Sequence, residues 1–186
     1  SAQCSANELD IYIHTKVGEF TMGTVQYKFA DETLMVTGAS SGIGQLVCED
    51  FAASGGNVVC IGRNRERLDK VVSAINESGA GSAVAVVGDV SQSSTFDEAV
   101  EITHATFGAL NYAFNCAGTE GPLSQISDTS DSEFAEMIDT KLTGCFLGLR
   151  AQITAMRETG GVIVNMVGSF GHVGYPYMGA YCAAAH

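Results

Sequence analysis

The stretch Thr37-Gly38-Ala39-Ser40-Ser41-Gly42-Ile43-Gly44 decides the fold of this chain. It follows a short apolar run at residues 34–36 and opens a segment with helical spacing at residues 43–54. Three glycines at a strand-to-helix turn let the backbone approach a phosphate closely, and the helix N-terminus offers N–H donors and a partial positive charge. In this strand–loop–helix context the stretch predicts a phosphate-binding loop, with a merely tight turn as the alternative.

Strand-length and helix-length patterns alternate along the rest of the chain. Short apolar runs predict strands at residues 34–36, 58–61, 83–87, 110–114 and 162–166. Helical spacing lies between and beside them, at residues 43–54, 64–78, 94–107 and 131–157. Strands that alternate with helices form βαβ units, and right-handed crossovers then give a parallel sheet covered on both faces. The chain is therefore predicted to be an α/β protein with a doubly wound parallel sheet.

Two of the predicted helices begin with a capping-box pattern, Ser94 with Asp97 and Ser130 with Glu133. The fourth predicted helix also carries an apolar stripe at three- and four-residue steps, as a helix packed on a core does. The stripe consists of Ile138, Leu142, Cys145, Leu149, Ile153 and Met156.

Composition and charge describe one acidic globular domain. The 186 residues include 9 Lys and Arg against 21 Asp and Glu, a formal net charge of −12, and 46% of the side chains are apolar. This charge argues against nucleic acid or an anionic membrane surface as a partner. The six cysteines are scattered singly, so we expect reduced thiols, no metal site and a cytoplasmic protein. No apolar run reaches the roughly 18 residues of a transmembrane helix.

Residues 1–30 differ from the regular part of the chain. The segment 10–17 alternates apolar and polar residues and predicts a short strand. Met22 is followed by Gly23 and has the character of a natural start, so residues 1–21 are either an added leader or part of the natural protein. We expect residues 1–30 to form an N-terminal extension and residues 31–186 to form the nucleotide-binding domain.

The glycine stretch is one of several motifs that occur in a recognisable order. Asp89-Val90 follows the third predicted strand, Asn115-Cys116-Ala117-Gly118 follows the fourth, and Tyr181-Cys182-Ala183-Ala184 follows the fifth. From Thr33 to His186 the sequence resembles the classical short-chain dehydrogenases/reductases. The resemblance implies a Rossmann fold with strand order 3-2-1-4-5. It also implies further strands beyond His186, so that residues 31–186 would be an incomplete domain.

The same resemblance implies an activity and a set of cofactor contacts. The activity is hydride transfer between a nicotinamide dinucleotide and a small-molecule ketone or alcohol, carried out by homo-oligomers. An S-adenosylmethionine enzyme on a similar sheet is disfavoured, because the segments after the fourth and fifth strands would then have no role. The cofactor contacts implied are Gly38, Ser40, Ser41, Gly42, Ile43, Gly44, Asp89, Val90, Asn115, Ala117, Gly118 and Tyr181.

The end of the second predicted strand favours NADP(H) over NAD(H). Sites for NAD place a carboxylate on the ribose about 20 residues beyond the glycines, whereas this chain has Gly62-Arg63-Asn64-Arg65-Glu66-Arg67 there. We predict that the Arg63 guanidinium binds the 2′-phosphate, with Asn64 beside it in the cofactor site. The alternative for these basic residues is a solvated helix face, which we expect for Arg67 and Lys70.

Tyr181 stands at the position of the family's catalytic tyrosine, but three other catalytic positions differ. Ala185 stands in place of the lysine, Lys141 in place of the asparagine, and Gly168 in place of the serine. Ser169 is the nearest hydroxyl, so we predict Tyr181 and Ser169 as the catalytic residues. Without the lysine the phenol loses its activation, and acid–base catalysis of this kind is worth about 10²–10⁴ in rate.

Two functions therefore stay open. The first is an NADP(H)-dependent oxidoreductase that is impaired in this form, and the second is a non-catalytic dinucleotide-binding protein. Two interpretations of Lys141 also stay open. Its long side chain could supply an ammonium beside Tyr181, or it could extend into solvent like most lysines on helices.

Overall fold

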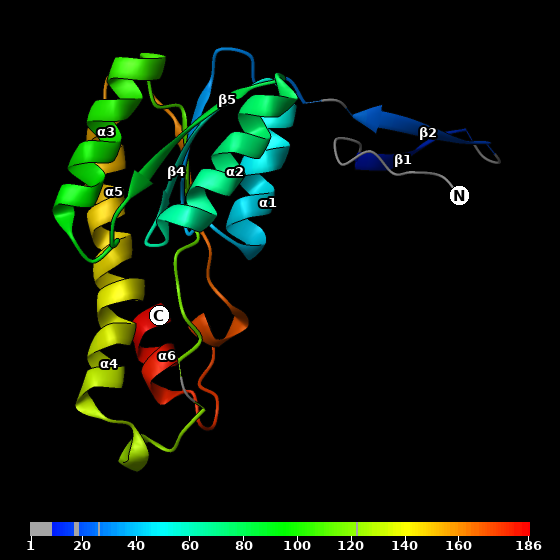
Figure 1. Cartoon of the computed structure of the whole chain (residues 1–186). Coiled ribbons are helices and arrows are strands. Elements are labelled where there is room, and N and C mark those ends of the chain that lie inside the picture. Colours follow the sequence, from blue (N-terminus) through cyan, green and yellow to red (C-terminus); the bar gives the residue numbers. More distant parts are fainter. Residues whose placement is uncertain (1–8, 17–18, 26, 122) are drawn as a thin grey trace.

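A five-stranded parallel sheet forms the centre of the structure (Figure 1). The computed structural model describes residues 9–16, 19–25, 27–121 and 123–186. The strands lie side by side in the order β5-β4-β3-β6-β7. They are β3 (Thr33–Thr37), β4 (Asn57–Gly62), β5 (Ser82–Val87), β6 (Tyr112–Asn115) and β7 (Val162–Asn165). Counted from β3 this is the order 3-2-1-4-5, so the predicted doubly wound sheet is confirmed.

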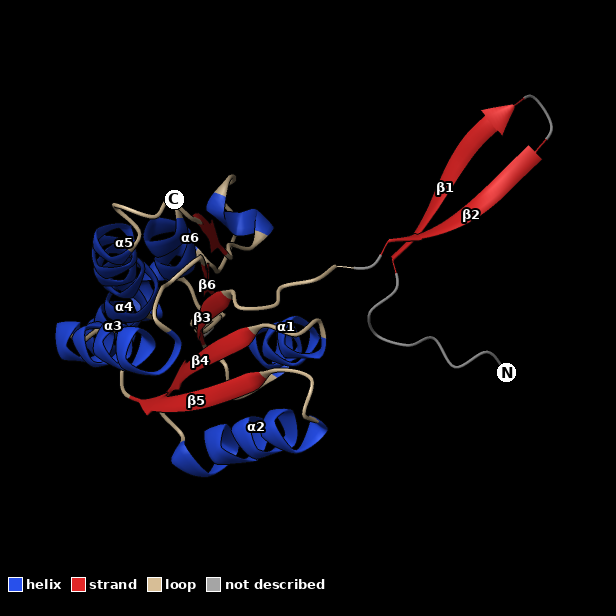
Figure 2. Ribbon diagram, turned by 90° about the horizontal axis from the view of Figure 1, so that it is seen from above, coloured by secondary structure: helices blue, strands red, loops and turns tan. Residues whose placement is uncertain are grey.

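Helices cover both faces of this sheet (Figure 2). One face carries α1 (Gly42–Ala53) and α2 (Arg65–Ser78). The other carries α3 (Ser93–Phe107) and α5 (Gly144–Ala155). Two shorter helices, α4 (Asp131–Met137) and α6 (Gly179–Ala185), extend beyond the carboxyl ends of the strands, where Figure 1 places them next to one another.

The interior positions of the central strands β3 and β4 are continuously apolar because side chains from both of their faces are buried. In β3, Leu34 and Val36 belong to the core beneath α1 and α2, whereas Met35 belongs to the core beneath α3 and α5. The residues of β4 alternate between the same two cores. This two-sided burial explains why continuous apolar runs, rather than alternating ones, predicted these strands.

The fourth predicted helix, residues 131–157, is not one regular α-helix. It consists of α4, a π-helical segment (Ile138–Thr143) and α5 in direct succession. The π-helical hydrogen-bonding pattern adds a residue to the turn, and π turns occur frequently at functional sites. Lys141 belongs to this segment.

The apolar stripe predicted for that helix is buried only in part. Met156 is buried and packs in the core beneath α3 and α5. Leu142 and Ile153 are 50% and 53% exposed. The buried positions of α5 are Gly144, Gly148 and Gln152. The stripe does not account for the rest of the buried face, because α5 approaches the neighbouring core through glycines, which a search for apolar side chains does not detect.

Of the two predicted capping boxes, one is present. The Ser130 hydroxyl accepts a hydrogen bond from the Glu133 N–H, and the Glu133 carboxylate accepts one from the Ser130 N–H at 2.8 Å. The prediction for Ser94 was wrong, because α3 begins at Ser93 and Ser94 lies within its first turn. The hydroxyl of Thr95, one residue further, donates to the Asp89 carbonyl at 2.8 Å and fixes the preceding loop against this turn.

A second, two-stranded antiparallel sheet precedes the Rossmann domain in sequence. It consists of β1 (Leu9–Lys16) and β2 (Glu19–Val25). The predicted strand at 10–17 is confirmed for residues 10–16, and Val17 lies outside the described residues. The sequence pattern did not predict β2, which contains Met22.

Across the described ranges, no helix is long and apolar enough to cross a membrane.

Candidate cofactor cleft and active site

A cleft of about 710 Å³ opens at the carboxyl ends of the parallel strands. Ligands bind at this edge in open α/β sheets, because the loops that follow the strands converge there. Loops after β3, β4, β5, β6 and β7 all contribute to its lining, together with the π-helical segment and α6. The lining includes these residues that the sequence predicted for the cofactor site: Gly38, Ser40, Ser41, Gly42, Ile43, Arg63, Asn64, Asp89, Val90, Ala117, Gly118 and Tyr181.

Three predicted site residues do not line this cleft. Gly44 is buried in α1, and a Cβ there would collide with the Gly38 carbonyl, so this glycine lets the helix pack on the loop. Asn115 is 9% exposed at the end of β6 and lines a neighbouring cavity. Ser169 is exposed at the start of a 3₁₀ turn, Ser169–Gly171, and its catalytic role stays a prediction.

The glycine loop has the geometry of an anion cradle. Gly38 has φ +72°, and a Cβ there would lie 3.0 Å from Ala117 Cα, so the loop packs directly on the backbone that follows β6. Ser41 precedes α1 without a side-chain capping bond, and the first turn of α1 contains no acidic residue. The N-terminus of α1 thus keeps the positive end of its dipole for a ligand.

Thr37 ties the glycine loop to the loop after β6. Its hydroxyl accepts hydrogen bonds from the N–H groups of Cys116 and Ala117, at 3.0 and 3.1 Å. On the other side, the Ala39 N–H donates to the Ile61 carbonyl at 3.1 Å. Three strands therefore fix the backbone of the loop at the floor of the cleft.

At the β4 end of the cleft, Arg63 and Asp89 form an ion pair with a distance of 3.8 Å. The Ser91 N–H donates to the Asp89 carboxylate at 2.9 Å. This bond lowers the pKa of Asp89 below its usual range, with help from the Ser91 hydroxyl and Arg63 and against the opposing effect of burial. Asp89 is therefore a stable anion that holds the Arg63 guanidinium at the cleft.

The three residues beyond Arg63 that the sequence singled out have different surroundings. Asn64 lines the cleft, but its side-chain oxygen caps α2 by accepting from the Arg67 N–H at 2.9 Å. Arg67, which we expected on a solvated helix face, is exposed and also lines the cleft. Lys70 is exposed and pairs with Glu66 at 2.7 Å, as a solvated helix face predicts.

Tyr181 lies at the opposite end of the cleft and is 7% exposed. Its hydroxyl accepts a hydrogen bond from the Gly168 N–H at 3.2 Å. The Phe170 ring packs edge-on against the Tyr181 ring with a centroid distance of 6.1 Å. Tyr181 is thus a buried phenol whose oxygen is held against the main chain at the place where the family has a serine side chain.

Lys141 lies against Tyr181. Its Nζ is 4.2 Å from the centroid of the Tyr181 ring. Lys141 also approaches the loop after β6, because a Cβ on Gly118 would lie 2.9 Å from the same Nζ. Burial raises the pKa of the nearby Cys116 thiol, against the opposing effects of a Gly44 N–H hydrogen bond and the Lys141 ammonium.

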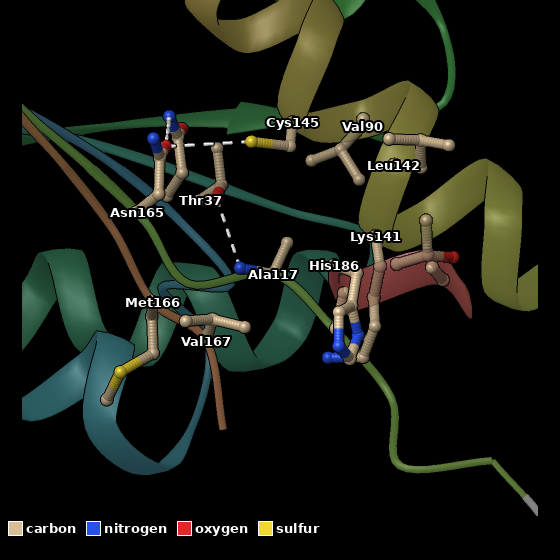
Figure 3. A pocket seen from close by; sticks show the side chains of 15 residues that line it. Thr37, Val90, Ala117, Lys141, Leu142, Cys145, Asn165, Met166, Val167 and His186 are labelled. Atoms are coloured by element: carbon tan, nitrogen blue, oxygen red, sulfur yellow. Dashed lines mark hydrogen bonds between the residues drawn. The ribbon is translucent and has the colours of Figure 1, made fainter. Parts of the chain in front are cut away.

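A smaller cavity of about 270 Å³ adjoins the cleft and shares Lys141 with it. Figure 3 shows the Lys141 side chain extending from its helix into this cavity. A network of side-chain amides lies at this cavity, and two of its members, Asn115 and Asn165, line it. Asn115 and Gln152 exchange two hydrogen bonds of 2.9 and 2.8 Å, and Asn115 also donates to Asn165 at 2.9 Å.

In the described part of the chain, no cluster of three or more His, Cys, Asp or Glu side chains could hold a metal ion. The described cysteines, Cys48, Cys60, Cys116, Cys145 and Cys182, are free.

Several residues of the cleft were not predicted from the sequence. One signal could have found most of them, because residues that directly end or follow a parallel strand line the crevice in this fold. Gly62 ends β4, Gly88 follows β5, and Met166 and Val167 follow β7. Thr140 has no such signal, since it reaches the cleft from the π-helical segment.

Comparison with known proteins gives consistent matches. Residues 32–186 match the family model described as short chain dehydrogenase. A 3beta-hydroxysteroid dehydrogenase of Mediterraneibacter gnavus is 35% identical over 169 residues, which cover 91% of this chain and 59% of that protein. A cyclohexanol dehydrogenase of an Acinetobacter species is 34% identical over 160 residues, covering 86% and 63%.

The match extends to three-dimensional structure. The chain superposes on an NAD⁺-bound xylitol dehydrogenase with a TM-score of 0.80 at 30% identity, covering 85% of this chain and 61% of the other. The chain thus spans about three fifths of the length of each of these relatives.

Proposed function

This chain belongs to the short-chain dehydrogenase/reductase family of oxidoreductases, and we propose that it uses NADP(H) to interconvert a ketone and an alcohol. The observation that carries the proposal is a single cleft lined by the glycine loop, Arg63 and Tyr181. When bound, the nicotinamide supplies or accepts the hydride. Tyr181 is the residue whose hydroxyl gives or takes the proton at the substrate oxygen. From the cysteine usage we further propose a cytoplasmic location.

The residues of the cleft fit a dinucleotide. The approach of Gly38 to Ala117 and the uncapped N-terminus of α1 suit a pyrophosphate at the floor of the cleft. Asp89 and Val90 lie on the β5 side, where the adenine end of a dinucleotide belongs in this fold. Tyr181 lines the same cleft at its other end, where the substrate oxygen would have to lie.

Arg63 supports NADP(H) as the preferred cofactor. At the end of β4, where an NAD site would have a carboxylate, this chain has Gly62, Arg63 and Asn64. The Arg63 guanidinium lines the cleft beside Asp89. The xylitol dehydrogenase was solved with NAD⁺ bound, so a protein of this fold can also bind NAD(H). We therefore assign the choice in this chain to Arg63, which can grip a 2′-phosphate with two parallel hydrogen bonds.

Replacing Arg63→Ala tests the cofactor preference directly. Loss of a charge-assisted hydrogen bond of about 1.5–3 kcal/mol weakens NADPH binding roughly 10- to 100-fold, whereas NADH binding changes little. The measurement is the dissociation constant of each dinucleotide by nicotinamide fluorescence. Arg65→Ala is the matched control, because Arg65 pairs with Asp69 on the exposed side of α2. Equal weakening of both cofactors by Arg63→Ala would refute the preference for NADP(H).

We propose that activity is reduced in this form, because Ala185 stands where the family has its lysine. The variant Ala185→Lys places an ammonium one helical turn after Tyr181, and we expect kcat to rise about 10-fold or more. The alternative function is a non-catalytic dinucleotide-binding protein, which the altered positions Ala185 and Gly168 favour. Tight NADPH binding without hydride transfer in either the unmodified chain or Ala185→Lys would identify that alternative.

The relatives suggest the class of substrate. By their names, one acts on a hydroxysteroid and one on cyclohexanol, both of which carry the hydroxyl on a ring. We propose an alicyclic ketone or secondary alcohol as substrate, in keeping with the exposed rings of Tyr175 and Tyr177 between β7 and α6. Cyclohexanones should then show at least about 10-fold higher kcat/KM than acyclic ketones of the same carbon number. Equal values would contradict this assignment.

A further inference from the structure

The cleft contains one cationic side chain at the tyrosine end. Among the described residues of its lining, the positively charged ones are Arg63, Arg67 and Lys141. The two arginines come from the segment that begins at the end of β4, whereas Lys141 lies against Tyr181. Ala185, one helical turn after Tyr181, carries no charge. The ammonium nearest to the phenol therefore comes from a different helix than the family pattern implies.

The local structure directs Lys141 toward Tyr181. Lys141 belongs to the π-helical segment between α4 and α5, and this segment packs against α6. Met137, four residues before Lys141, is 1% exposed and packs in the same cluster as Tyr181. Gly118 leaves the space that the lysine end occupies, because a Cβ on Gly118 would lie 2.9 Å from Lys141 Nζ. The ammonium is thus enclosed between the loop after β6 and the phenol ring.

An ammonium in this place favours a negative phenol. Its Nζ is 4.2 Å from the ring centroid of Tyr181, within the range of a cation–π contact. The attraction is stronger for a tyrosinate, because part of the negative charge is delocalised into the ring. The Gly168 N–H donates to the Tyr181 oxygen at 3.2 Å and stabilises the same charge from another side.

We propose that Lys141 is the electrostatic partner of Tyr181 and supplies some, but not all, of the stabilisation that a lysine at position 185 supplies in the family. This inference rests on the proposed function. In the reducing direction, Tyr181 gives its proton to the substrate oxygen while the carbonyl carbon receives a hydride, and a proton from water then restores the phenol. Lys141 stabilises the tyrosinate left in between. It acts through Tyr181 and is a positioning residue, not one that touches the reacting atoms.

Other ionisable groups belong to the elements packed against α6, which carries Tyr181. The elements packed against α6 are α4, the π-helical segment and the 3₁₀ turn Ser169–Gly171. Ionisable side chains on these elements, besides Lys141, are Asp131, Glu133, Glu136 and Asp139. His172 follows the 3₁₀ turn, and Cys182 and His186 are on or directly after α6. The acidic groups oppose tyrosinate formation, so the effect of Lys141 is measured against a constant background of these groups.

Ultraviolet titration of the chain without cofactor tests the proposal independently of turnover. Subtracting the tyrosinate absorbance of Tyr181→Phe from that of each protein isolates the ionisation of Tyr181. If the contact acts as proposed, Lys141→Met moves this ionisation to higher pH, since the ammonium 4.2 Å from the ring centroid is lost. Lys141→Arg keeps a positive charge and should retain most of the effect. An unchanged ionisation in Lys141→Met would overturn the proposal.

Kinetics with NADPH and a cyclohexanone supply the second readout. Lys141→Met should lower kcat about 10-fold or more and leave the KM for NADPH within about twofold, because the ammonium acts on proton transfer. Added propylamine should restore part of kcat in Lys141→Ala, and a merely structural lysine would not respond to the amine. Turnover that is unaffected by Lys141→Met would refute the partnership while the proposed function stands. A shifted ionisation without any turnover would refute the function and retain the partnership.

Discussion

At position 168 the lack of a side chain determines where the phenol of Tyr181 lies. The Gly168 N–H donates to the Tyr181 oxygen, and a Cβ at Gly168 would lie 2.7 Å from that oxygen. Gly168→Ala is therefore expected to displace the phenol tip and lower turnover. Gly168→Ser causes the same displacement but adds a hydroxyl that can polarise the substrate oxygen, a contribution of about 10²-fold in comparable sites.

The comparison between these two variants isolates the hydroxyl, since they differ in one oxygen atom. We expect kcat of Gly168→Ser to exceed kcat of Gly168→Ala in a steady-state NADPH oxidation assay. Equal kcat values would mean that the residue does not act on the substrate oxygen. In that case Ser169→Ala shows whether the neighbouring hydroxyl polarises the substrate oxygen, because removing that hydroxyl would then lower kcat below that of the unmodified chain.

At the scale of the element, α5 depends on a glycine, Gly148, where it packs closely on the core. A Cβ at Gly148 would lie 3.1 Å from the Phe96 ring and 3.2 Å from the Asn115 side-chain oxygen. Gly148→Ala improves helix propensity by about 1 kcal/mol, but overpacking of a close contact costs about 1–3 kcal/mol. We expect a net loss of stability in urea unfolding. Thr154→Ala, on the exposed side of the same helix, is the control; a stabilised Gly148→Ala would show that α5 can move outward.

The start of α4 provides a pH-dependent element. The Ser130 N–H holds the pKa of Glu133 below its usual range, with the Ser130 hydroxyl adding to the effect. A lowered pKa in the folded state means that the cap stabilises α4 above the ordinary Glu pKa of about 4.3, and that this contribution disappears as the pH falls through the lower folded value. Protection of the first α4 amides from hydrogen exchange should therefore fall in acid. In Glu133→Gln, which cannot ionise, protection should not depend on pH in this range.

At the scale of the whole molecule, the family resemblance implies a homo-oligomer, and we propose the exposed face of the fourth helical segment as its interface. Leu142, Phe146 and Ile153 are 50%, 58% and 53% exposed on this segment. Phe146→Glu places a charge in the middle of this face and should convert an oligomer to monomers in sedimentation equilibrium. Leu46→Glu, at a similarly exposed leucine of α1, is the matched control and should leave the mass unchanged. An identical mass for all three proteins would remove this face from the interface.

Most of the sheet could be predicted from the sequence, for a physical reason. The interior positions of strands buried on both faces are apolar, so β3 and β4 contain short continuous apolar runs that can be recognised without knowing the neighbouring strands. The buried face of α5 could not be predicted, because it consists of Gly144, Gly148 and Gln152. Their burial depends on close approach to Val90 and Phe96, a tertiary contact that no local pattern reports.

The part of the candidate site that the main chain forms could be predicted from the sequence. The part that depends on contacts between side chains of different helices and strands was harder to predict. The glycine loop is local, and its sequence specifies the turn and the helix N-terminus together. Lys141 and Tyr181 are in contact although they are 40 residues apart in the sequence (181 − 141). The contact depends on the π-helical segment that carries Lys141, and the sequence does not specify the hydrogen bonding of that segment. The sequence therefore left Lys141 with two interpretations, and only the fold placed its ammonium on the ring.

The reciprocal hydrogen bonds between the Asn115 and Gln152 amides also restrict which substitutions this protein can accept in evolution. Each amide donates one hydrogen bond to the other and accepts one from it, in a place where Gln152 is fully buried. Replacing either residue alone leaves a buried donor and acceptor unpaired, at a cost of about 1–3 kcal/mol, whereas replacing both with apolar groups of similar shape is nearly neutral. Single-step mutational paths away from the pair thus pass through a less stable intermediate. Positions 115 and 152 should covary among descendants of this sequence.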